Sequence, residues 1–188
     1  MRPVDIDEIQ NIAEYELIRP AWRPKVMALK ELRRVGVGGH LTLLFENRET
    51  VRDQIQEMMR IERIVRPRDI AHEVSTYNEL IPGPAELSAS LLIEYEDAPQ
   101  RAVRLRELLG LEHHVWLEVN GKRSQARFDA RQISTDRLSA VQYVKFPLSP
   151  EQVAKFPQGA RIVIDHPKYS PEQALRAEQL LELGKDLE

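Results

Sequence analysis

The spacing of hydrophobic residues divides the chain into a helical first part and a strand-rich second part. Residues 20–33 and 48–65 repeat apolar side chains with the period of a helix, and a shorter helix through Ala13 precedes them. Pro20 suits a first helical turn, where its missing N–H has no partner. Asn47 can cap the helix at 48–65, and Pro67 ends it. Residues 87–95 then alternate apolar and polar side chains, which predicts a strand.

The rest of the chain predicts short strands separated by turns and short helices. Apolar runs favour strands at 41–46, 115–119, 140–146 and 162–164, and Asn120-Gly121 predicts a hairpin that pairs 115–119 with 123–128. Ser-Pro-Glu-Gln occurs at 149–152 and again at 170–173, and each copy predicts the start of a helix, the second reaching about Leu183. The chain lacks strict strand–helix alternation. We therefore expect one α+β domain over residues 1–188, with a mainly antiparallel sheet and helices packed on it.

Composition narrows the chemistry that the chain can perform. There is no cysteine among 188 residues, so disulfides, thiolate metal sites and cysteine-ligated iron–sulfur clusters are excluded. The net charge is −3, which gives no electrostatic reason to expect nucleic-acid or membrane binding. Basic stretches such as Arg33-Arg34 are expected on solvated helix faces. With no apolar leader at its start, the chain is expected to be soluble and cytoplasmic.

The acidic residue with the least expected position is Glu62. At about 100° per residue, it lies near the centre of the apolar stripe of the helix at 48–65. A carboxylate facing a core needs a partner, because an unpaired buried charge costs several kcal/mol. Glu62 is therefore a candidate general base or ligand in an internal cavity. The alternatives are a structural salt bridge and a helix end that has emerged into solvent.

Four further residues near predicted element ends are candidates for a site. Glu46 stands where the strand at 41–46 meets the long helix, as a second catalytic carboxylate or as a solvated strand end. Asn47 and Asn78 are candidate ligand contacts through their amides, although Asn47 also suits a helix cap. Arg60 lies off the apolar stripe, where it could hold an anionic group.

His166 is the strongest histidine candidate. It follows the strand at 162–164, and Pro167 favours an extended backbone that presents the ring at the strand end. Asp165 or Tyr169 could orient the ring, and Tyr169 is also a candidate ligand contact. The other histidines lack metal-motif spacing, so a metal held by Glu and His side chains has no assigned ligand set. The alternative is an exposed loop histidine packed on Tyr169.

Several blocks of the sequence are specific in their residues and order. They are Arg34–Arg48, Thr50-Val51, Gln54–Ile64, Tyr77–Pro82, Ser139–Tyr143 and Ile164–Tyr169. Together they resemble the bacterial domain-of-unknown-function 3501 family over nearly the whole chain. The resemblance implies no assigned activity. It implies an association with rubrerythrin-like proteins and iron–sulfur oxidoreductases, and so a role near peroxide handling or electron transfer.

Three functions follow as hypotheses. The first is an accessory protein that contacts an iron-dependent redox partner, of the rubrerythrin-like or iron–sulfur type. The second is a metal-dependent enzyme or small-molecule binder that uses Glu46, Glu62 and His166. The third is a homodimer that pairs through the apolar stripe of the helix at 48–65.

Overall fold

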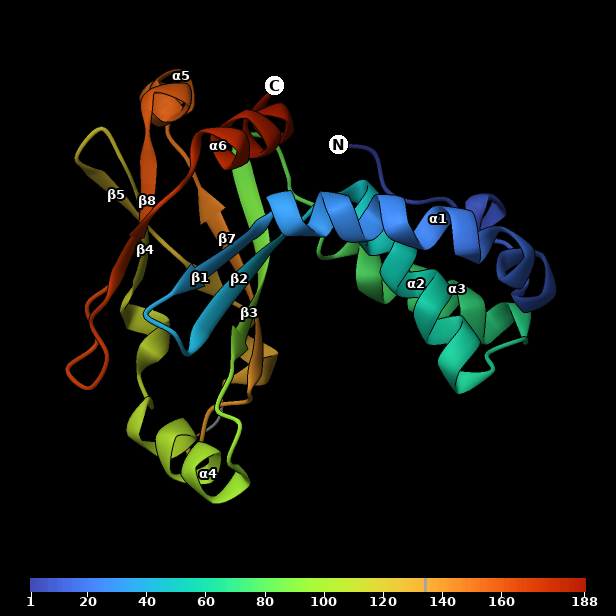
Figure 1. Cartoon of the computed structure of the whole chain (residues 1–188), viewed down its shortest axis with the longest axis horizontal. Helices are drawn as coiled ribbons and strands as arrows, with labels where there is room; N and C mark the ends of the chain where they lie inside the picture. Colours follow the sequence, from blue (N-terminus) through green and yellow to red (C-terminus); the bar gives the residue numbers. More distant parts are fainter. Residues whose placement is uncertain (134) are drawn as a thin grey trace.

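The computed structural model describes residues 1–133 and 135–188, and Figure 1 shows a β-rich body beside a helical arm. The first sheet has the order β1 (Arg34–Val37), β2 (Leu41–Glu46), β3 (Glu86–Ile93), β7 (Val141–Pro147) and β6 (Arg127–Phe128). The second has the order β5 (Lys122–Gln125), β4 (Val115–Val119), β8 (Ala160–Ile164) and β9 (Glu172–Ala174). Neighbouring strands are antiparallel throughout the described residues, which confirms the α+β prediction.

The body has its apolar core on the inner faces of its two sheets. Alternation along each strand sends apolar side chains inward, as for Leu87, Ala89 and Leu91 of β3, and leaves Ser88 and Ser90 on the opposite face. The remaining helices of the body are α4 (Ala98–Glu107), α5 (Pro150–Lys155) and α6 (Ala177–Gly184). The outer face of the five-stranded sheet is therefore polar, and one end of it meets the arm.

The arm consists of α1 (Ile12–Leu32), α2 (Arg48–Glu62) and α3 (Pro67–Asn78), which follow the short 3-10 helix η1 (Ile6–Glu8). Val51, Ile55 and Met59 of α2 pack with Val74 of α3 and with Val4 of the N-terminal segment. The apolar stripe of α2, which the sequence left open to a second copy, is thus covered within the chain. These side chains are therefore not available on the surface for packing against a second copy.

The prediction that a helix begins at Pro20 is wrong, because α1 runs unbroken through both Pro20 and Pro24. An internal proline removes one helical hydrogen bond and normally breaks a helix. Both prolines lie on the exposed side of α1, so water can bind the carbonyl groups that lose an N–H partner. Contacts of the opposite side with α2 hold the helix together.

Two predicted elements near the chain end are also corrected. Residues 172–174 form β9, which completes the edge of β8, and α6 begins only at Ala177. Arg33 is fully buried instead of solvated. Its guanidinium donates to Glu182 at 3.1 Å and to the carbonyl oxygen of Phe45 at 2.9 Å, and it pairs with Asp186. This residue fastens the C-terminal helices to the root of the arm.

Candidate functional site

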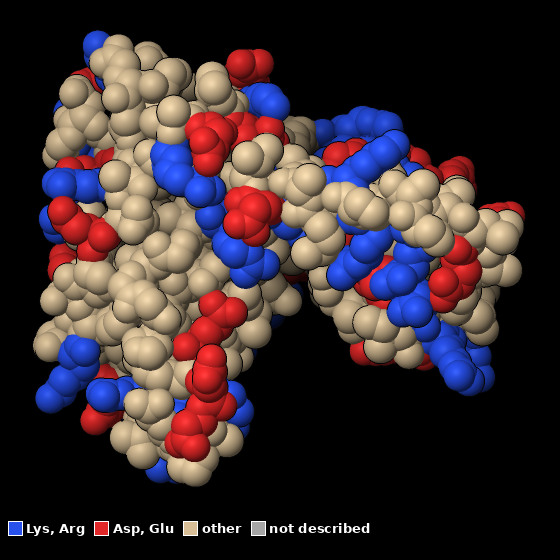
Figure 2. Space-filling view, viewed as in Figure 1, with Lys and Arg blue, Asp and Glu red and all other residues tan. Residues whose placement is uncertain are grey.

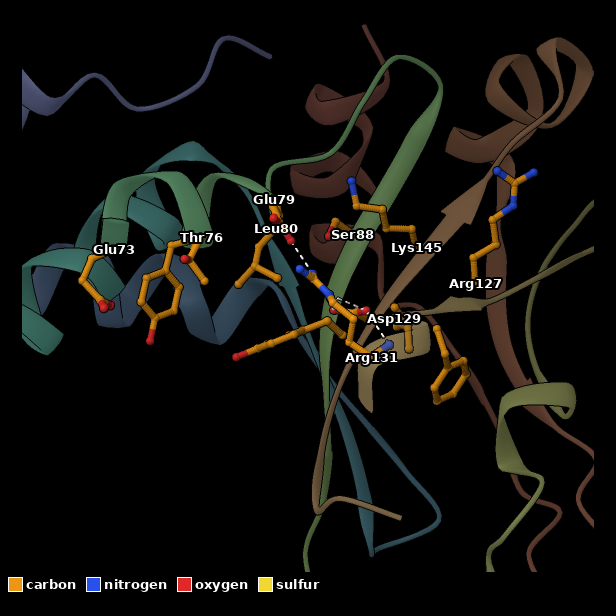
Figure 3. A pocket seen from close by; sticks show the side chains of 13 residues that line it. Glu73, Thr76, Glu79, Leu80, Ser88, Arg127, Asp129, Arg131 and Lys145 are labelled. Carbon is orange, nitrogen blue, oxygen red and sulfur yellow. Dashed lines mark hydrogen bonds and ion pairs between the residues drawn. The ribbon is translucent and has the colours of Figure 1, made fainter. Parts of the chain in front are cut away.

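A cleft of about 570 Å³ lies where the arm meets the outer face of the five-stranded sheet (Figure 3). The arm and the body meet there at a re-entrant angle (Figure 2). The arm contributes Glu73, Thr76, Tyr77, Glu79 and Leu80 to the lining. The body contributes Ser88, Arg127, Phe128, Asp129, Arg131, Tyr143, Val144 and Lys145. The lining combines aromatic rings, hydroxyl groups and charges of both signs.

Strand parity explains why polar side chains reach this cleft. Ser88 faces Lys145 across the β3–β7 ladder, and Ser90 faces Tyr143 two residues further on. Their sequence neighbours Ala89 and Val144 point to the sandwich core. The same alternation that builds the core therefore places a hydroxyl, a phenol and an ammonium group on the floor of the cleft.

Two hydroxyl groups on this floor are free to bind a ligand. Within the described residues, neither the Tyr143 hydroxyl nor that of Ser88 has a hydrogen-bond partner. Burial raises the pKa of Tyr143, and the carboxylates of Glu46 and Asp129 raise it further. Burial likewise raises the pKa of Tyr77 across the cleft. Both phenols are thus protonated hydrogen-bond donors at neutral pH.

The charges of the cleft are only partly compensated. Arg131 pairs with Asp129 at 2.7 Å and with Glu79, and so links the 3-10 helix η3 (Ala130–Gln132) of the body to the end of α3. Lys145 lies 3.1 Å from Glu86, measured from Nζ to Oε1. Arg127 has no carboxylate partner within the described residues. The wall formed by β6 and β7 therefore presents the less neutralised positive charge.

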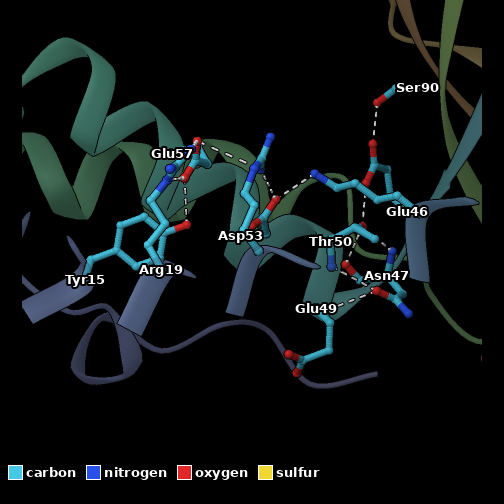
Figure 4. Close-up of polar contacts among 11 residues, drawn as sticks. Tyr15, Arg19, Glu46, Asn47, Glu49, Thr50, Asp53, Glu57 and Ser90 are labelled. Carbon is cyan, nitrogen blue, oxygen red and sulfur yellow. Dashed lines mark hydrogen bonds and ion pairs between the residues drawn. The ribbon is translucent and has the colours of Figure 1, made fainter. Parts of the chain in front are cut away.

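Glu46 lies directly behind this floor and is buried, not a solvated strand end. Its Oε1 accepts a hydrogen bond of 2.6 Å from Ser90, and its Oε2 accepts one from Thr50 (Figure 4). Both oxygens are engaged by neutral hydroxyl donors, and none of these contacts is with a cationic side chain. Its charge acts on the cleft through Tyr143, whose pKa it raises.

Glu62 does not point into the core, and the structure corrects that expectation. It is exposed because α2 ends at this residue, and Arg63 leaves the helix in a left-handed conformation with φ 55°. The stripe extrapolated to residue 65 therefore stops one turn early, and the charge lies in solvent. Arg60 pairs with Glu16 of α1 at 2.6 Å and lies outside the cleft.

His166 is buried, but its two ring nitrogens are already engaged. Nδ1 accepts a hydrogen bond from the Lys168 N–H at 3.2 Å, so Nε2 carries the proton and donates to the carbonyl oxygen of Leu109 at 3.1 Å. Asp165 binds His114 instead of His166, at 3.0 Å. Tyr169 donates to the carbonyl oxygen of Val37. These contacts close the turn after β8 and leave the ring no free nitrogen.

Both asparagine candidates hold the backbone. Asn47 caps α2 by accepting hydrogen bonds from the N–H groups of Glu49 and Thr50, both at 3.0 Å. Asn78 grips Val4 through two hydrogen bonds, one to the backbone N–H and one to the carbonyl oxygen. These amides order the arm and the N-terminal segment, and neither lines the cleft.

The three predicted catalytic residues do not converge. Glu46 and Glu62 stand at opposite ends of α2, about 22 Å apart along the helix, and His166 belongs to the edge of the other sheet. In the part of the chain that the structure describes, no group of three or more His, Asp or Glu side chains could hold a metal ion. Glu46, Glu62 and His166 therefore do not form one shared site.

Buried charges between α1 and α2, which the apolar pattern of the sequence does not predict, form a second polar cluster (Figure 4). Glu57 is buried and accepts hydrogen bonds from Tyr15 at 2.8 Å and from Arg19 at 2.7 Å. Asp53 is fully buried and pairs with Lys30 at 2.7 Å and with Arg23 at 3.1 Å. The sequence does contain a pattern that matches this contact. Asp53 and Glu57 are four residues apart on α2, and their partners Arg23 and Arg19 are four residues apart on α1.

Comparisons with known proteins give a family but no activity. A family model described as a protein of unknown function, DUF3501, matches residues 3–187. A crystal structure of a novel protein of unknown function from Burkholderia pseudomallei K96243 is similar, with a TM-score of 0.93, 32% identity and 100% coverage of both chains. No curated protein matches the chain. No helix within the described residues has the length and apolar character needed to cross a bilayer.

Proposed function

This chain belongs to the DUF3501 family of proteins of unknown function, and we propose that it binds a small organic anion with a planar apolar body in the cleft between α3 and the five-stranded sheet. The observation that carries the proposal is the cleft floor. There, the hydroxyl groups of Ser88 and Tyr143 have no partners in the described residues, and Lys145 and three aromatic rings line the same cleft. A hydroxyl without a protein partner at the floor of a cleft is available to donate to a ligand.

Size and lining select the ligand class. A cavity of about 570 Å³ is within the range of sites for single small molecules. Tyr77, Phe128 and Tyr143 offer ring surfaces to a planar body. Lys145 and Arg127 attract a carboxylate or phosphate group, and the Tyr143 and Ser88 hydroxyls donate to its oxygens. Glu73, on the arm side, disfavours a second negative charge at the other end of the ligand.

The proposal is tested with benzoate, 2-naphthoate and hexanoate, each beside its uncharged amide, by NMR of the ¹⁵N-labelled full chain. The aromatic carboxylates are expected to shift backbone signals of β3, β7 and the end of α3, and the amides to bind at least about tenfold more weakly. Replacing Arg127 and Lys145 together by Gln is expected to remove that preference for charge. Tyr143→Phe is expected to weaken all three carboxylates.

The matched control is Arg106→Gln on α4, which removes an exposed arginine far from the cleft lining. It is expected to leave binding unchanged. The proposal is wrong if neither benzoate nor 2-naphthoate shifts cleft signals, or if each binds no better than its amide or than hexanoate. It is also wrong if the signals that shift belong to the sandwich edge instead of β3, β7 and α3.

A second candidate function is the accessory role beside an iron-dependent redox partner that the family resemblance implies. The observation that favours a contact role is the tip of the arm, where Ile61 and Val65 are 65% and 69% exposed. Arg63, Arg66 and Arg68 surround them, and of these only Arg68 has an ion-pair partner in the described residues. Arginines around an apolar centre are typical of an interface, here one for an acidic protein surface.

This accessory role predicts which protein is captured and by which surface. Tagged chain, cross-linked under anaerobic conditions, is expected to recover an iron–sulfur or rubrerythrin-like protein. Ile61→Asp with Val65→Asp is expected to lose it, whereas the control Val103→Asp on α4, at a site 52% exposed, retains it. Recovery of no such partner, or equal recovery by both variants, contradicts the role.

A further inference from the structure

The solvent-facing side of α1 is apolar along most of its length. Six exposed residues form this surface, which we call the α1 face: Ala13, Leu17, Pro20, Ala21, Pro24 and Ala28. At about 100° per residue they all lie within about 60° of the direction of Leu17. Leu17 is 83% exposed, more than any other large hydrophobic side chain of the described residues.

The buried side of α1 combines apolar residues, Tyr15 and Val26, with charged ones. This side carries its charges into the contact with α2, through Arg19 and Lys30. Figure 2 shows an uncharged strip along α1 with charged groups on both edges. A helix normally turns its apolar side to a core, so an apolar side left outside, and flanked by charge, indicates a surface that another molecule covers.

We propose that a second copy of this chain covers the α1 face, and that the two α1 helices pack antiparallel about a two-fold axis near Ala21. The α1 face is about 22 Å long from Ala13 to Ala28. Its alanines and prolines are small enough to allow close approach of two helix backbones. In this arrangement Leu17 of one copy lies against Pro24 of the other, and each contact occurs twice.

The charges beside the α1 face favour a second copy of the chain, packed antiparallel. Glu14 and Lys25 lie on the same edge of the α1 face, at about 60° and 80° from Leu17. Both are exposed, and neither has an ion-pair partner within the described residues. The antiparallel two-fold places Glu14 of each copy beside Lys25 of the other. A parallel two-fold pair would instead leave Glu14 of one copy and Lys25 of the other on opposite edges and about 16 Å apart along the helix axis, so neither charge would gain a partner.

Charge reversal tests this pairing, with dimerisation measured by sedimentation equilibrium. Glu14→Lys and Lys25→Glu are each expected to raise the dimer dissociation constant about tenfold, because each creates two like-charge contacts. The double variant restores both pairs with reversed polarity and is expected to return to the wild-type value. Leu17→Asp is expected to give a monomer. These sites are all on the surface, so circular dichroism should show an unchanged fold.

A cysteine probe gives a second, independent readout, since the chain has no cysteine of its own. Ala21→Cys is expected to form a disulfide-linked dimer on mild oxidation, because the two copies of this residue lie near the axis. Val103→Cys, an exposed control on α4, is expected not to. A wild-type chain that stays monomeric at several hundred micromolar overturns the proposal. So does equal cross-linking of the two cysteine variants, or failure of the double charge reversal to restore dimerisation.

Discussion

The body and the arm bury different chemistry in their main internal contacts. Between the two sheets of the body the buried side chains are almost all apolar, with Phe45 and Phe146 at a ring distance of 6.1 Å. In the arm, α2 packs an apolar side against α3, but it meets α1 through carboxylates, arginines and a lysine. One molecule thus combines a core held by the hydrophobic effect with a contact held by paired charges.

The difference shows how α2 can pack against two helices at once. The apolar side of α2 is occupied by α3, so its other side must meet α1 with polar residues. Paired buried charges add little net stability over apolar packing, yet they are costly to break and they fix orientation. We therefore expect the body to depend on side-chain volume, and the arm to depend on charge balance and pH.

The largest effect is expected in the body. Phe146→Ala removes a fully buried ring and is expected to lower the free energy of unfolding by about 3–5 kcal/mol, because the cavity cannot collapse between two sheets. Urea unfolding followed by circular dichroism measures it. A loss under about 1.5 kcal/mol would show that the core between the two sheets tolerates a cavity, and would contradict the expectation that the body depends on side-chain volume.

The next effect is expected at the α1–α2 contact. Asp53→Ala leaves the buried ammonium of Lys30 without its carboxylate and is expected to cost about 3 kcal/mol. Replacing the pair together, Asp53→Leu with Lys30→Met, is expected to recover most of that loss, since apolar packing substitutes for a buried ion pair. Urea unfolding of the three chains measures both. If the double variant is no better than Asp53→Ala, burial of an unpaired charge is not the cause.

Acid is expected to loosen the arm before the body. The hydrogen bonds from Arg19 lower the pKa of Glu57 from 4.5 to about 2. A lowered folded-state pKa gives stability that is present above pH 4.5 and is lost as the pH falls towards 2, up to about 3 kcal/mol. Trp22 of α1 and Trp116 of β4 report on the arm and the body separately. Glu57→Gln is expected to remove the change in Trp22 fluorescence between pH 4.5 and 2. If Trp22 fluorescence in this variant still changes with pH as in the wild-type chain, protonation of Glu57 is not the cause.

The smallest effects separate two carboxylates at the ends of α2. Glu46→Gln weakens the acceptor for Ser90 and Thr50 and is expected to cost about 1–2 kcal/mol. Glu62→Gln changes an exposed side chain and is expected to stay within about 0.5 kcal/mol. Thermal unfolding of both variants measures the difference. A larger loss at Glu62 than at Glu46 would reverse the correction made by the structure.

Local sequence determined most elements of this protein. The period-two alternation of β3, the Asn120-Gly121 hairpin, the Asn47 cap and the absence of cysteine all act within a few residues, so they could be predicted from the sequence. The apolar run at 41–46 and the cap at Asn47 likewise locate Glu46 at a strand–helix junction, and in the structure this junction lies behind the cleft floor. The prediction for Glu62 was wrong because α2 ends at this residue, about one turn before the predicted helix end at residue 65.

Only the tertiary structure decided which polar residues are buried and which surfaces remain open. Asp53, Glu57 and Arg33 look like ordinary surface residues in the sequence, and their burial depends on partners 12 to 153 positions away. The cleft likewise joins residues of α3, β3 and β7 that no local pattern connects. Periodicity reports which way a side chain points along its own element, whereas the cost of burying a charge is set by groups that meet it only after folding.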